Sequence, residues 1–398
     1  MTTPRQEPPI DPTEIYTLLK GLPVIGRSDG SVQIGLDPPA AVLLQDAPPH
    51  AVGILRSLDG TAPLAAVLAR YRADARLWTD LLHGVRSAGL LVPGGQWTFP
   101  GLSGGPPFEP ERDSLVLRHG IETARLVLQA RRDAVVVVRG SGLVATAVAT
   151  ALLAAGVGHV HQQADRVLRL AEQPAGVPPP DAATARTPLT PGSADRRPRS
   201  PHTELRPESA PPLPSRPDVG SGAAVKAAGA VLTAHLARVA PDARVRAPAA
   251  HLRVTLTVLA GDGPPAPSLA AELIGRRLPH LSVRAGLVHA VVGPLVLPGR
   301  SSCLLCALRH RTELDSGRAE VEQGMRRDVL VPPAQLVAAA SMLAVNEALD
   351  HLDGLTVPTT VDGTVEWRIG SLVPRRRSWS VHPDCGCARA PGTTSARW

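Results

Sequence analysis

The stretch AVVVVRGSGLVA at residues 134–145 joins a run of four valines to a glycine-rich turn. A continuous β-branched run without polar alternation is typical of a strand buried on both faces of a parallel sheet. The turn at 140–142 leads into an apolar helical stretch, and a second strand is expected after the glycines at 156 and 158. Nucleotide-binding α/β folds begin in this order, because glycines let the backbone approach a phosphate at a helix N-terminus. The candidate nucleotide-contacting residues of the turn are Gly140, Gly142 and Ala145.

A second block of alternating elements follows further along the chain. We expect helices over 224–239, 267–278 and 333–352, and strands over 245–246, 254–259, 281–284, 288–292 and 364–369. Together the two blocks predict one α/β domain with a Rossmann-type mixed sheet, formed from two halves at 112–170 and 221–390.

A proline- and arginine-rich segment separates the two halves. Residues 172–220 hold 13 of the 42 prolines and the run RRPRS, and they show no apolar periodicity. Such a composition cannot bury enough apolar surface to offset the entropy of folding. We therefore expect a disordered insert over 171–220, and disordered ends over 1–21 and 391–398.

A smaller unit is predicted ahead of the α/β domain, over residues 22–95. Its patterns indicate short strands at 22–25, 32–36 and 41–44, helices at 50–58, 63–71 and 75–88, and a strand at 90–92. Short strands combined with three small helices predict a winged helix-turn-helix. The third helix offers only Arg76 and Arg86 among many apolar residues, which is a poor base-reading face and disfavours DNA binding.

All four cysteines fall in two close pairs, Cys303 with Cys306 and Cys385 with Cys387, with 78 residues between the pairs. Two remote thiol pairs are typical of a zinc site, and four thiolates leave no open position, which indicates a structural ion. Two disulfides or four free thiols are the alternatives. No secretion signal is evident, so disulfides are disfavoured.

Two histidines lie near these pairs in the sequence. His310 and His382 are alternative ligands, although we expect each to support the site from outside the coordination shell.

Composition excludes several classes of function. The uncharged stretch 140–159 contains a Gly-Ser-Gly turn and does not suit a membrane-spanning helix. The net charge of +7 rests on arginine, since Lys20 and Lys226 are the only lysines, and much of it falls in the insert. With only two Phe and two Tyr, stacking on single-stranded nucleic acid has little support. We expect a cytoplasmic protein without membrane or nucleic-acid partners.

These motifs resemble the ThiF/MoeB-like superfamily of ubiquitin-activating-type adenylyltransferases. The resemblance covers roughly residues 20–390 and rests on the glycine turn at 140–142, AAGVG at 154–158, VVGPL at 291–295 ahead of Cys303, and HPDCGC at 382–387. The sequence looks most similar to the ThiF-like proteins of thiazole/oxazole-modified microcin biosynthesis, which are described as cyclodehydratases or precursor leader-peptide-binding proteins.

The resemblance implies a role for the N-terminal unit. In that family it is a PqqD-like peptide recognition element, to whose sheet edge a leader peptide adds as a strand. The implied peptide-binding residues here are Ala41, Val42, Leu43 and Leu44. The alternative is that this unit only packs on the larger domain or forms a dimer contact. The resemblance also suggests a homodimer.

The nucleotide site departs from the family pattern. The family has a G-x-G-G-x-G loop, an Asp-x-Asp after the second strand and an Asn-Leu-x-Arg-Gln segment; here the loop is GSGLVA, the strand ends in QQADR, and the last segment has no counterpart. Asp165 is the remaining ribose candidate, Asp262 is a loose match to the magnesium aspartate, and Lys226 lies near the family lysine. ATP and Mg²⁺ are therefore doubtful cofactors, because charge stabilisation needs these groups placed together.

The sequence thus predicts a scaffold that captures a leader peptide and presents the precursor to a YcaO-type cyclodehydratase. The chain ends 11 residues after Cys387, so we expect that enzyme to be a separate protein. If all four thiols bind zinc, no cysteine remains to form a thioester. The alternatives are an adenylyltransferase that activates a peptide or carrier-protein C-terminus, and a DNA-binding regulatory module.

Overall fold

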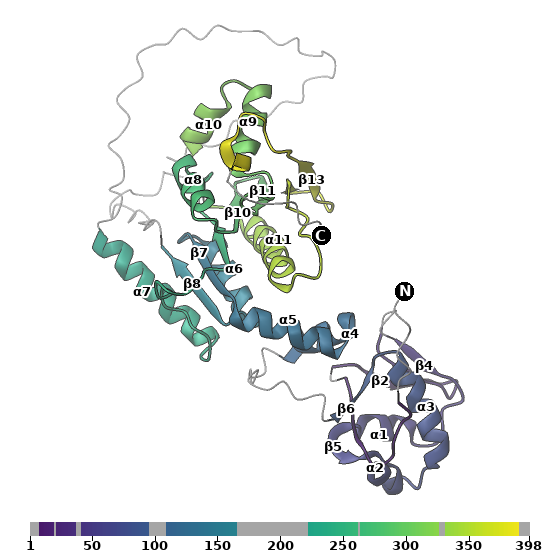
Figure 1. Cartoon of the computed structure of the whole chain (residues 1–398). Coiled ribbons are helices and arrows are strands. Elements are labelled where there is room, and N and C mark those ends of the chain that lie inside the picture. The colour runs from purple at the N-terminus through teal and green to yellow at the C-terminus, as the bar shows by residue number, and fades with distance from the viewer. Residues whose placement is uncertain are drawn as a thin grey trace, which may run out of the picture.

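A seven-stranded mixed sheet forms the centre of the chain (Figure 1). The computed structural model describes residues 8–19, 21–36, 41–94, 109–164, 222–261, 263–325 and 331–389. The strand order is β13-β12-β11-β10-β9-β7-β8. The strands are β7 (Val135–Arg139), β8 (His159–Gln163), β9 (Leu256–Leu259), β10 (His280–Ala285), β11 (His289–Val296), β12 (Gly363–Arg368) and β13 (Arg375–Ser378).

The sheet is parallel at one end and antiparallel at the other. Strands β8, β7, β9 and β10 run parallel, and β11, β12 and β13 each pair antiparallel with the strand before them. The four valines of β7 are all buried, as expected for a strand covered on both faces. The predicted mixed α/β sheet is therefore confirmed.

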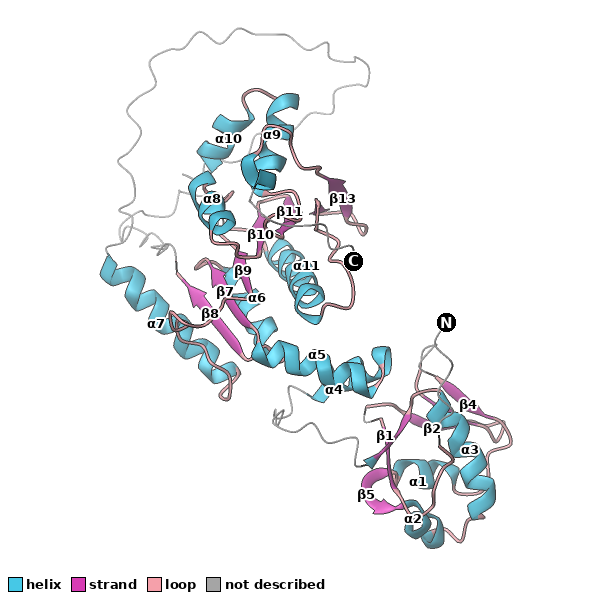
Figure 2. Ribbon diagram, in the orientation of Figure 1, coloured by secondary structure: helices cyan, strands magenta, loops and turns pink. Residues whose placement is uncertain are grey.

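Two helices pack on one face of this sheet (Figure 2). Helix α6 (Leu143–Ala154) contacts β7 and β8, and α11 (Ala334–Asp353) contacts β10, β11 and α6. Both supply small or branched residues to one continuous core, including the fully buried Val148, Leu152 and Ala344. The remaining helices of this part are α4 (Glu109–His119), α5 (Ile121–Asp133), α7 (Gly222–Val239), α8 (Pro267–Gly275), α9 (Leu304–Leu314) and α10 (Arg318–Met325).

The N-terminal unit contains two three-stranded sheets, ordered β5-β1-β6 and β2-β3-β4. Its elements are β1 (Ile15–Leu18), β2 (Val24–Gly26), β3 (Val32–Ile34), β4 (Val42–Leu44), α1 (Ala51–Arg56), β5 (Asp59–Pro63), α2 (Leu64–Arg70), α3 (Ala75–Ser87) and β6 (Leu91–Pro93). The three predicted helices and the strands near 22–25, 32–36, 41–44 and 90–92 are present with small shifts of their ends. The winged-helix assignment itself stays a prediction.

Disorder over residues 1–21 is wrong for residues 8–19. Strand β1 lies between β5 and β6, and it buries Tyr16 and Leu18 in the core of the N-terminal unit. The alternation of Tyr16 and Leu18 is the sequence signal for this strand. The predicted insert and the tail at 391–398 lie outside the described residues.

Other differences lie within the α/β part. The expected strand at 245–246 does not form; Arg244 makes only an isolated bridge with His159. Helices α4 and α5 were not predicted, since charged residues interrupt their apolar positions. Within the described ranges, no helix is both long and apolar enough to cross a membrane.

A buried arginine ties α5 to two other helices. The guanidinium of Arg131 donates to both carboxylate oxygens of Asp353, at 2.6 and 2.7 Å, and to Glu111 at 2.6 Å. It also donates to the carbonyl oxygen of Ala155 at the end of α6. The Arg131 side chain is 2% exposed and that of Asp353 is 9% exposed, so each charge depends on the other for compensation.

The Asp353→Asn variant tests this tie. Losing one partner of a buried pair leaves the Arg131 charge undercompensated, and we expect the free energy of unfolding in urea to fall by about 3 kcal/mol. Glu272→Gln is the matched control, because it breaks the exposed pair with Arg276 and should cost under ~0.5 kcal/mol. Equal small effects of both changes would contradict the role given to Arg131.

Candidate functional site

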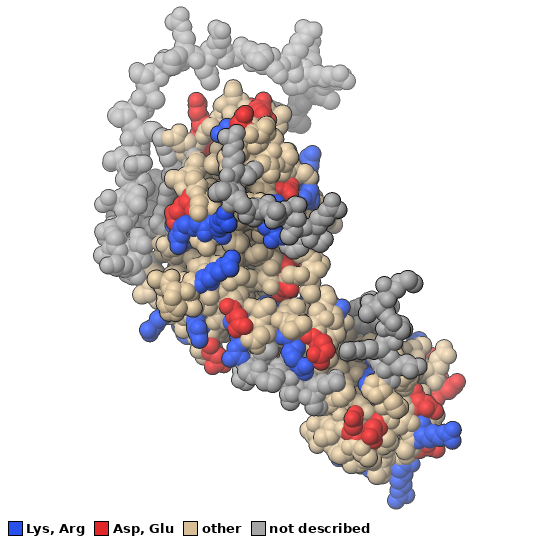
Figure 3. Space-filling model, viewed as in Figure 1, with Lys and Arg blue, Asp and Glu red and all other residues tan. Residues whose placement is uncertain are grey.

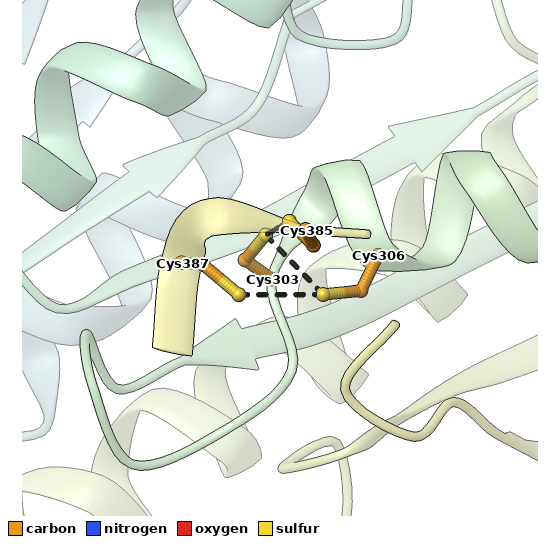
Figure 4. Close-up of side chains that lie close together, drawn as sticks. All are labelled: Cys303, Cys306, Cys385 and Cys387. Carbon is orange, nitrogen blue, oxygen red and sulfur yellow. Dashed lines mark hydrogen bonds between the residues drawn. The ribbon is translucent and has the colours of Figure 1, made fainter. Parts of the chain in front are cut away.

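The two cysteine pairs meet at one point in the structure (Figure 4). The Sγ atoms of Cys303 and Cys306 are 3.6 Å apart, those of Cys303 and Cys385 are 3.6 Å apart, and those of Cys306 and Cys387 are 3.4 Å apart. All four sulfurs lie within 4.8 Å of one another, and all four residues are buried. A disulfide needs about 2.05 Å, whereas sulfurs bound at about 2.3 Å to one tetrahedral ion lie about 3.8 Å apart. The arrangement therefore fits a metal ion and not two disulfides.

The start of helix α9 positions the first cysteine pair, Cys303 and Cys306, at this point. Cys303 occupies the N-cap of α9 and Cys306 lies in its first turn, so both sulfurs lie at the positive end of the helix. Asp362 links the two cysteine-bearing segments. Its carboxylate accepts from the Ser302 N–H at 2.6 Å, and its carbonyl oxygen accepts from the Trp379 N–H at 2.9 Å.

Burial disfavours ionisation of two of the four thiols, those of Cys303 and Cys387. Burial raises the pKa of Cys303 to about 12, and burial together with the neighbouring thiols also raises the pKa of Cys387. Burial acts in the same direction on Cys306, but hydrogen bonds with the backbone of Cys303 and His382 outweigh it and lower the pKa of that thiol. A divalent ion would supply the positive charge that four clustered thiolates need.

The two histidines near the pairs form a network with Glu313. The Glu313 carboxylate lies 2.9 Å from Nε2 of His382 and 3.3 Å from Nδ1 of His310, and the two rings are 4.8 Å apart. The backbone N–H of Asp384 donates to Nδ1 of His382, and that of Cys385 donates to its carbonyl oxygen. The histidines thus brace the second cysteine pair, which agrees with the expected supporting role. Glu313 was not anticipated from the sequence.

The glycine turn lies between β7 and α6, as predicted. Gly140 has a φ of 144°, and a Cβ at this position would lie 2.2 Å from the carbonyl oxygen of Ala260. Gly142 is the N-cap of α6 with no side-chain cap, and Ala145 is fully buried in the first turn. The turn therefore retains the tight backbone geometry of a phosphate-binding loop.

Near the end of β8, the strand that follows the glycine turn and α6, the chain has a glutamine where nucleotide-binding folds have an acidic residue. Gln162 is 1% exposed, and its Nε2 donates to the carbonyl oxygen of Gly140 at 3.0 Å and to Oγ1 of Thr146 at 3.1 Å. Its Oε1 has no hydrogen-bond partner in the described part of the chain. The amide nitrogen of Gln162 therefore binds the glycine turn, and the side chain offers no negative charge at this position.

The other sequence candidates for nucleotide binding are not placed. Asp165 and Asp262 lie outside the described residues, and Lys226 has a placed backbone in α7 without a described side chain. On the described residues, the turn thus keeps its glycines, while the two candidate carboxylates for ribose and Mg²⁺ lie outside those residues.

The predicted peptide-binding residues lie at the edge of a small sheet. Among the described residues, strand β4 pairs only with β3, so one of its edges has no described strand beside it. Leu43 is 43% exposed, whereas Leu44 is buried and Val42 is half-buried. The opposite outer strand, β2, contacts α1, whose Arg56 donates to the carbonyl oxygen of Val24 at 2.9 Å. The β4 edge is therefore the more open of the two.

The space-filling view shows basic and acidic side chains interspersed over the visible face (Figure 3). This mixture differs from the continuous basic surface on which nucleic-acid binding usually depends.

Replacing one cysteine tests the metal site. We expect wild-type protein to carry one equivalent of a divalent ion by elemental analysis, and Cys306→Ser to lose it with a stability loss of at least about 3 kcal/mol. His310→Gln is the matched control, because His310 contacts Glu313 but is not among the four sulfur ligands, and it should keep the ion. Metal-free wild-type protein of full stability would exclude the site.

Comparisons with known proteins bear on the fold. No protein-family model matches the sequence, and no curated protein matches it. Among solved structures, E. coli MccB with succinimide is similar at a TM-score of 0.52 and 13% identity, over 94% of this chain and 99% of that chain.

Two further structures show the same likeness. The microcin C7 biosynthetic enzyme MccB in complex with N-formylated MccA has a TM-score of 0.51 and 12% identity, over 94% of this chain and 99% of that one. The heterocyclase TruD has a TM-score of 0.50 and 14% identity, over 94% of this chain and 43% of TruD. At the level of the fold, the predicted resemblance is confirmed: this chain shares the fold of MccB and of part of TruD.

Proposed function

We propose that this protein binds the leader of a ribosomally made precursor peptide and presents the precursor to a separate modifying enzyme, a YcaO-type cyclodehydratase. The open edge of β4 carries the proposal. An extended peptide can satisfy the outward backbone groups of this edge, while its side chains contact Leu43. In this reading the N-terminal unit is a PqqD-like winged-helix recognition element.

The similar structures support a precursor peptide as the ligand. MccB has been crystallised with its peptide MccA, and TruD is a heterocyclase. The glycine turn without described acidic partners supports a scaffold rather than an adenylating enzyme, because Gln162 occupies the strand end where a ribose-binding carboxylate would lie. A cytoplasmic homodimer remains our expectation.

We also propose that the ion held by the four cysteines is zinc with a structural role. Four buried thiolates suit zinc and leave no position for water or substrate. The ion would join the start of α9 to the segment that follows β13, and so fix the antiparallel end of the sheet.

A paired substitution tests leader binding. A fluorescent synthetic leader, taken from a short precursor encoded beside this protein, is titrated and followed by fluorescence polarisation. We expect Leu43→Asp to weaken binding about tenfold, since it places a charge on the edge where apolar contact is worth roughly 1.5 kcal/mol.

Ile25→Asp is the matched control for this test. Ile25 is also 43% exposed and lies in the same cross-strand row as Gln33 and Leu43, but on the opposite outer strand. We expect the affinity of the Ile25→Asp variant for the leader to stay within about twofold of that of the wild type. Equal losses in the two variants, or no binding by wild-type protein, would refute binding at β4.

Pyrophosphate exchange separates the scaffold from an adenylyltransferase. We expect no exchange of labelled pyrophosphate into ATP with Mg²⁺ and leader peptide present, because the described site lacks carboxylates at the glycine turn. Exchange that disappears in Gly142→Val, which introduces a branched side chain at the N-cap of α6, would establish the adenylating function instead.

A further inference from the structure

A small pocket lies on the sheet face that α11 does not cover. Its volume is about 50 Å³, which is room for roughly four water-sized groups. Along β10, Leu281 and Val283 belong to the core that contains α11, so the alternating residues Ser282 and Arg284 point to the other face and into the pocket. The segment before α8 and helices α9 and α10 complete its walls.

The pocket contains a cation without a partner. Within the described residues, the guanidinium of Arg284 makes no hydrogen bond and no ion pair, although the side chain is largely buried. Burial lowers its pKa from the ordinary arginine value, but arginine remains charged in proteins. A buried charge without a partner is costly, so a binding partner for this guanidinium would stabilise the protein.

The neighbouring charges leave the pocket positive. Arg311 and Arg318 share the single carboxylate of Glu322, at 3.5 and 3.4 Å, and Glu322 is 5% exposed. The guanidinium of Arg311 also lies 4.7 Å from the ring of Trp379. With Arg284, and with Arg377, which pairs with Glu366 at 2.9 Å, four positive side chains lie near two negative ones, Glu322 and Glu366.

Two further features favour a small anion. Pro267 and Ala270, in the first turn of α8, line the pocket, so the positive end of that helix adds to its potential. The hydroxyl-bearing Ser282 offers a hydrogen bond, and apart from Arg284, Arg311 and Glu322 the lining residues are apolar, including Val291 and Leu308. An apolar wall lowers the local dielectric and strengthens a charge-assisted hydrogen bond.

We propose that this pocket binds one anionic group, a carboxylate or a phosphate, through Arg284 and Arg311. The inference goes beyond leader binding and does not depend on it, because the pocket lies in the α/β part and the β4 edge in the N-terminal unit. A carboxylate would come from a peptide chain terminus, and a phosphate from solution or from a phosphorylated ligand.

Calorimetric titration of the full chain at constant ionic strength tests the proposal. The probes are sodium phosphate and one short acetylated, leucine-ended peptide, made as the free acid and as the amide. We expect millimolar or tighter binding of phosphate or of the free acid, and at least tenfold weaker binding of the amide. Binding of phosphate alone identifies a phosphate pocket, and binding of the free acid alone identifies a chain-terminus pocket.

Two variants establish where the anion binds. Arg284→Gln should weaken binding at least tenfold while the melting temperature is kept or raised, because the change removes an unpaired buried charge. Arg284→Lys should bind the anion within about threefold of wild type, since it keeps the positive charge. This variant tests the role of the charge if Arg284→Gln does not fold. Arg276→Gln on the exposed side of α8 is the matched control and should bind like wild type.

Three results would overturn the proposal: no binding of either anion by wild-type protein, equal binding by wild type and Arg284→Gln, or equal losses in Arg284→Gln and Arg276→Gln. Leader affinity measured on the same variants should be unchanged, so failure of this pocket and failure of leader binding are separate outcomes.

Discussion

Convergence of four thiols is the constraint on which the C-terminal part of this structure depends. Cys303 and Cys306 begin α9, while Cys385 and Cys387 close the described chain, and the long helix α11 and the outer strands β12 and β13 lie between them in sequence. Four buried thiols gain little by contacting one another, and burial raises the pKa of Cys303 and of Cys387. A shared divalent ion would turn this cluster into a crosslink between α9 and the end of the sheet. Asp362 and the Glu313 network hold the two segments at the spacing that the ion needs.

The same fold carries a glycine turn with an altered environment. The backbone at Gly140 is as tight as a phosphate loop requires, but a buried glutamine is hydrogen-bonded to its carbonyl oxygen. Electrostatic groups, rather than the turn, provide most of the stabilisation in phosphoryl and adenylyl transfer. The two sites that we propose for ligands, the β4 edge and the pocket beside β10, lie away from this turn.

Local patterns made much of this architecture predictable. The valine run of β7, the alanine-rich α11 and the three helices of the N-terminal unit have periodicities that depend on few distant contacts. Strand β1 was missed because its four residues are stable only between β5 and β6, and α4 and α5 because their apolar positions are few and separated by charges. The cysteine spacing predicted the four-sulfur cluster, since two remote thiol pairs have few other uses in one chain.

The environment of single polar side chains could not be predicted in this way. Gln162 is an ordinary residue in the sequence, and only the packing of β8 beside β7 shows that its amide binds the glycine turn. Likewise, Arg284 is one of many arginines until the alternation along β10 places it in a pocket with Arg311. Such interactions join residues that are tens to hundreds of positions apart, as the pair of Arg131 and Asp353 also does.

The central claim is that a leader peptide adds to the β4 edge. Hydrogen–deuterium exchange of the full chain, with and without the synthetic leader, tests it most directly. The account predicts slower exchange of the backbone amides of Val42–Leu44 when the peptide is bound, with the glycine turn at 140–142 unchanged. Protection at the glycine turn without protection at β4 would contradict the account.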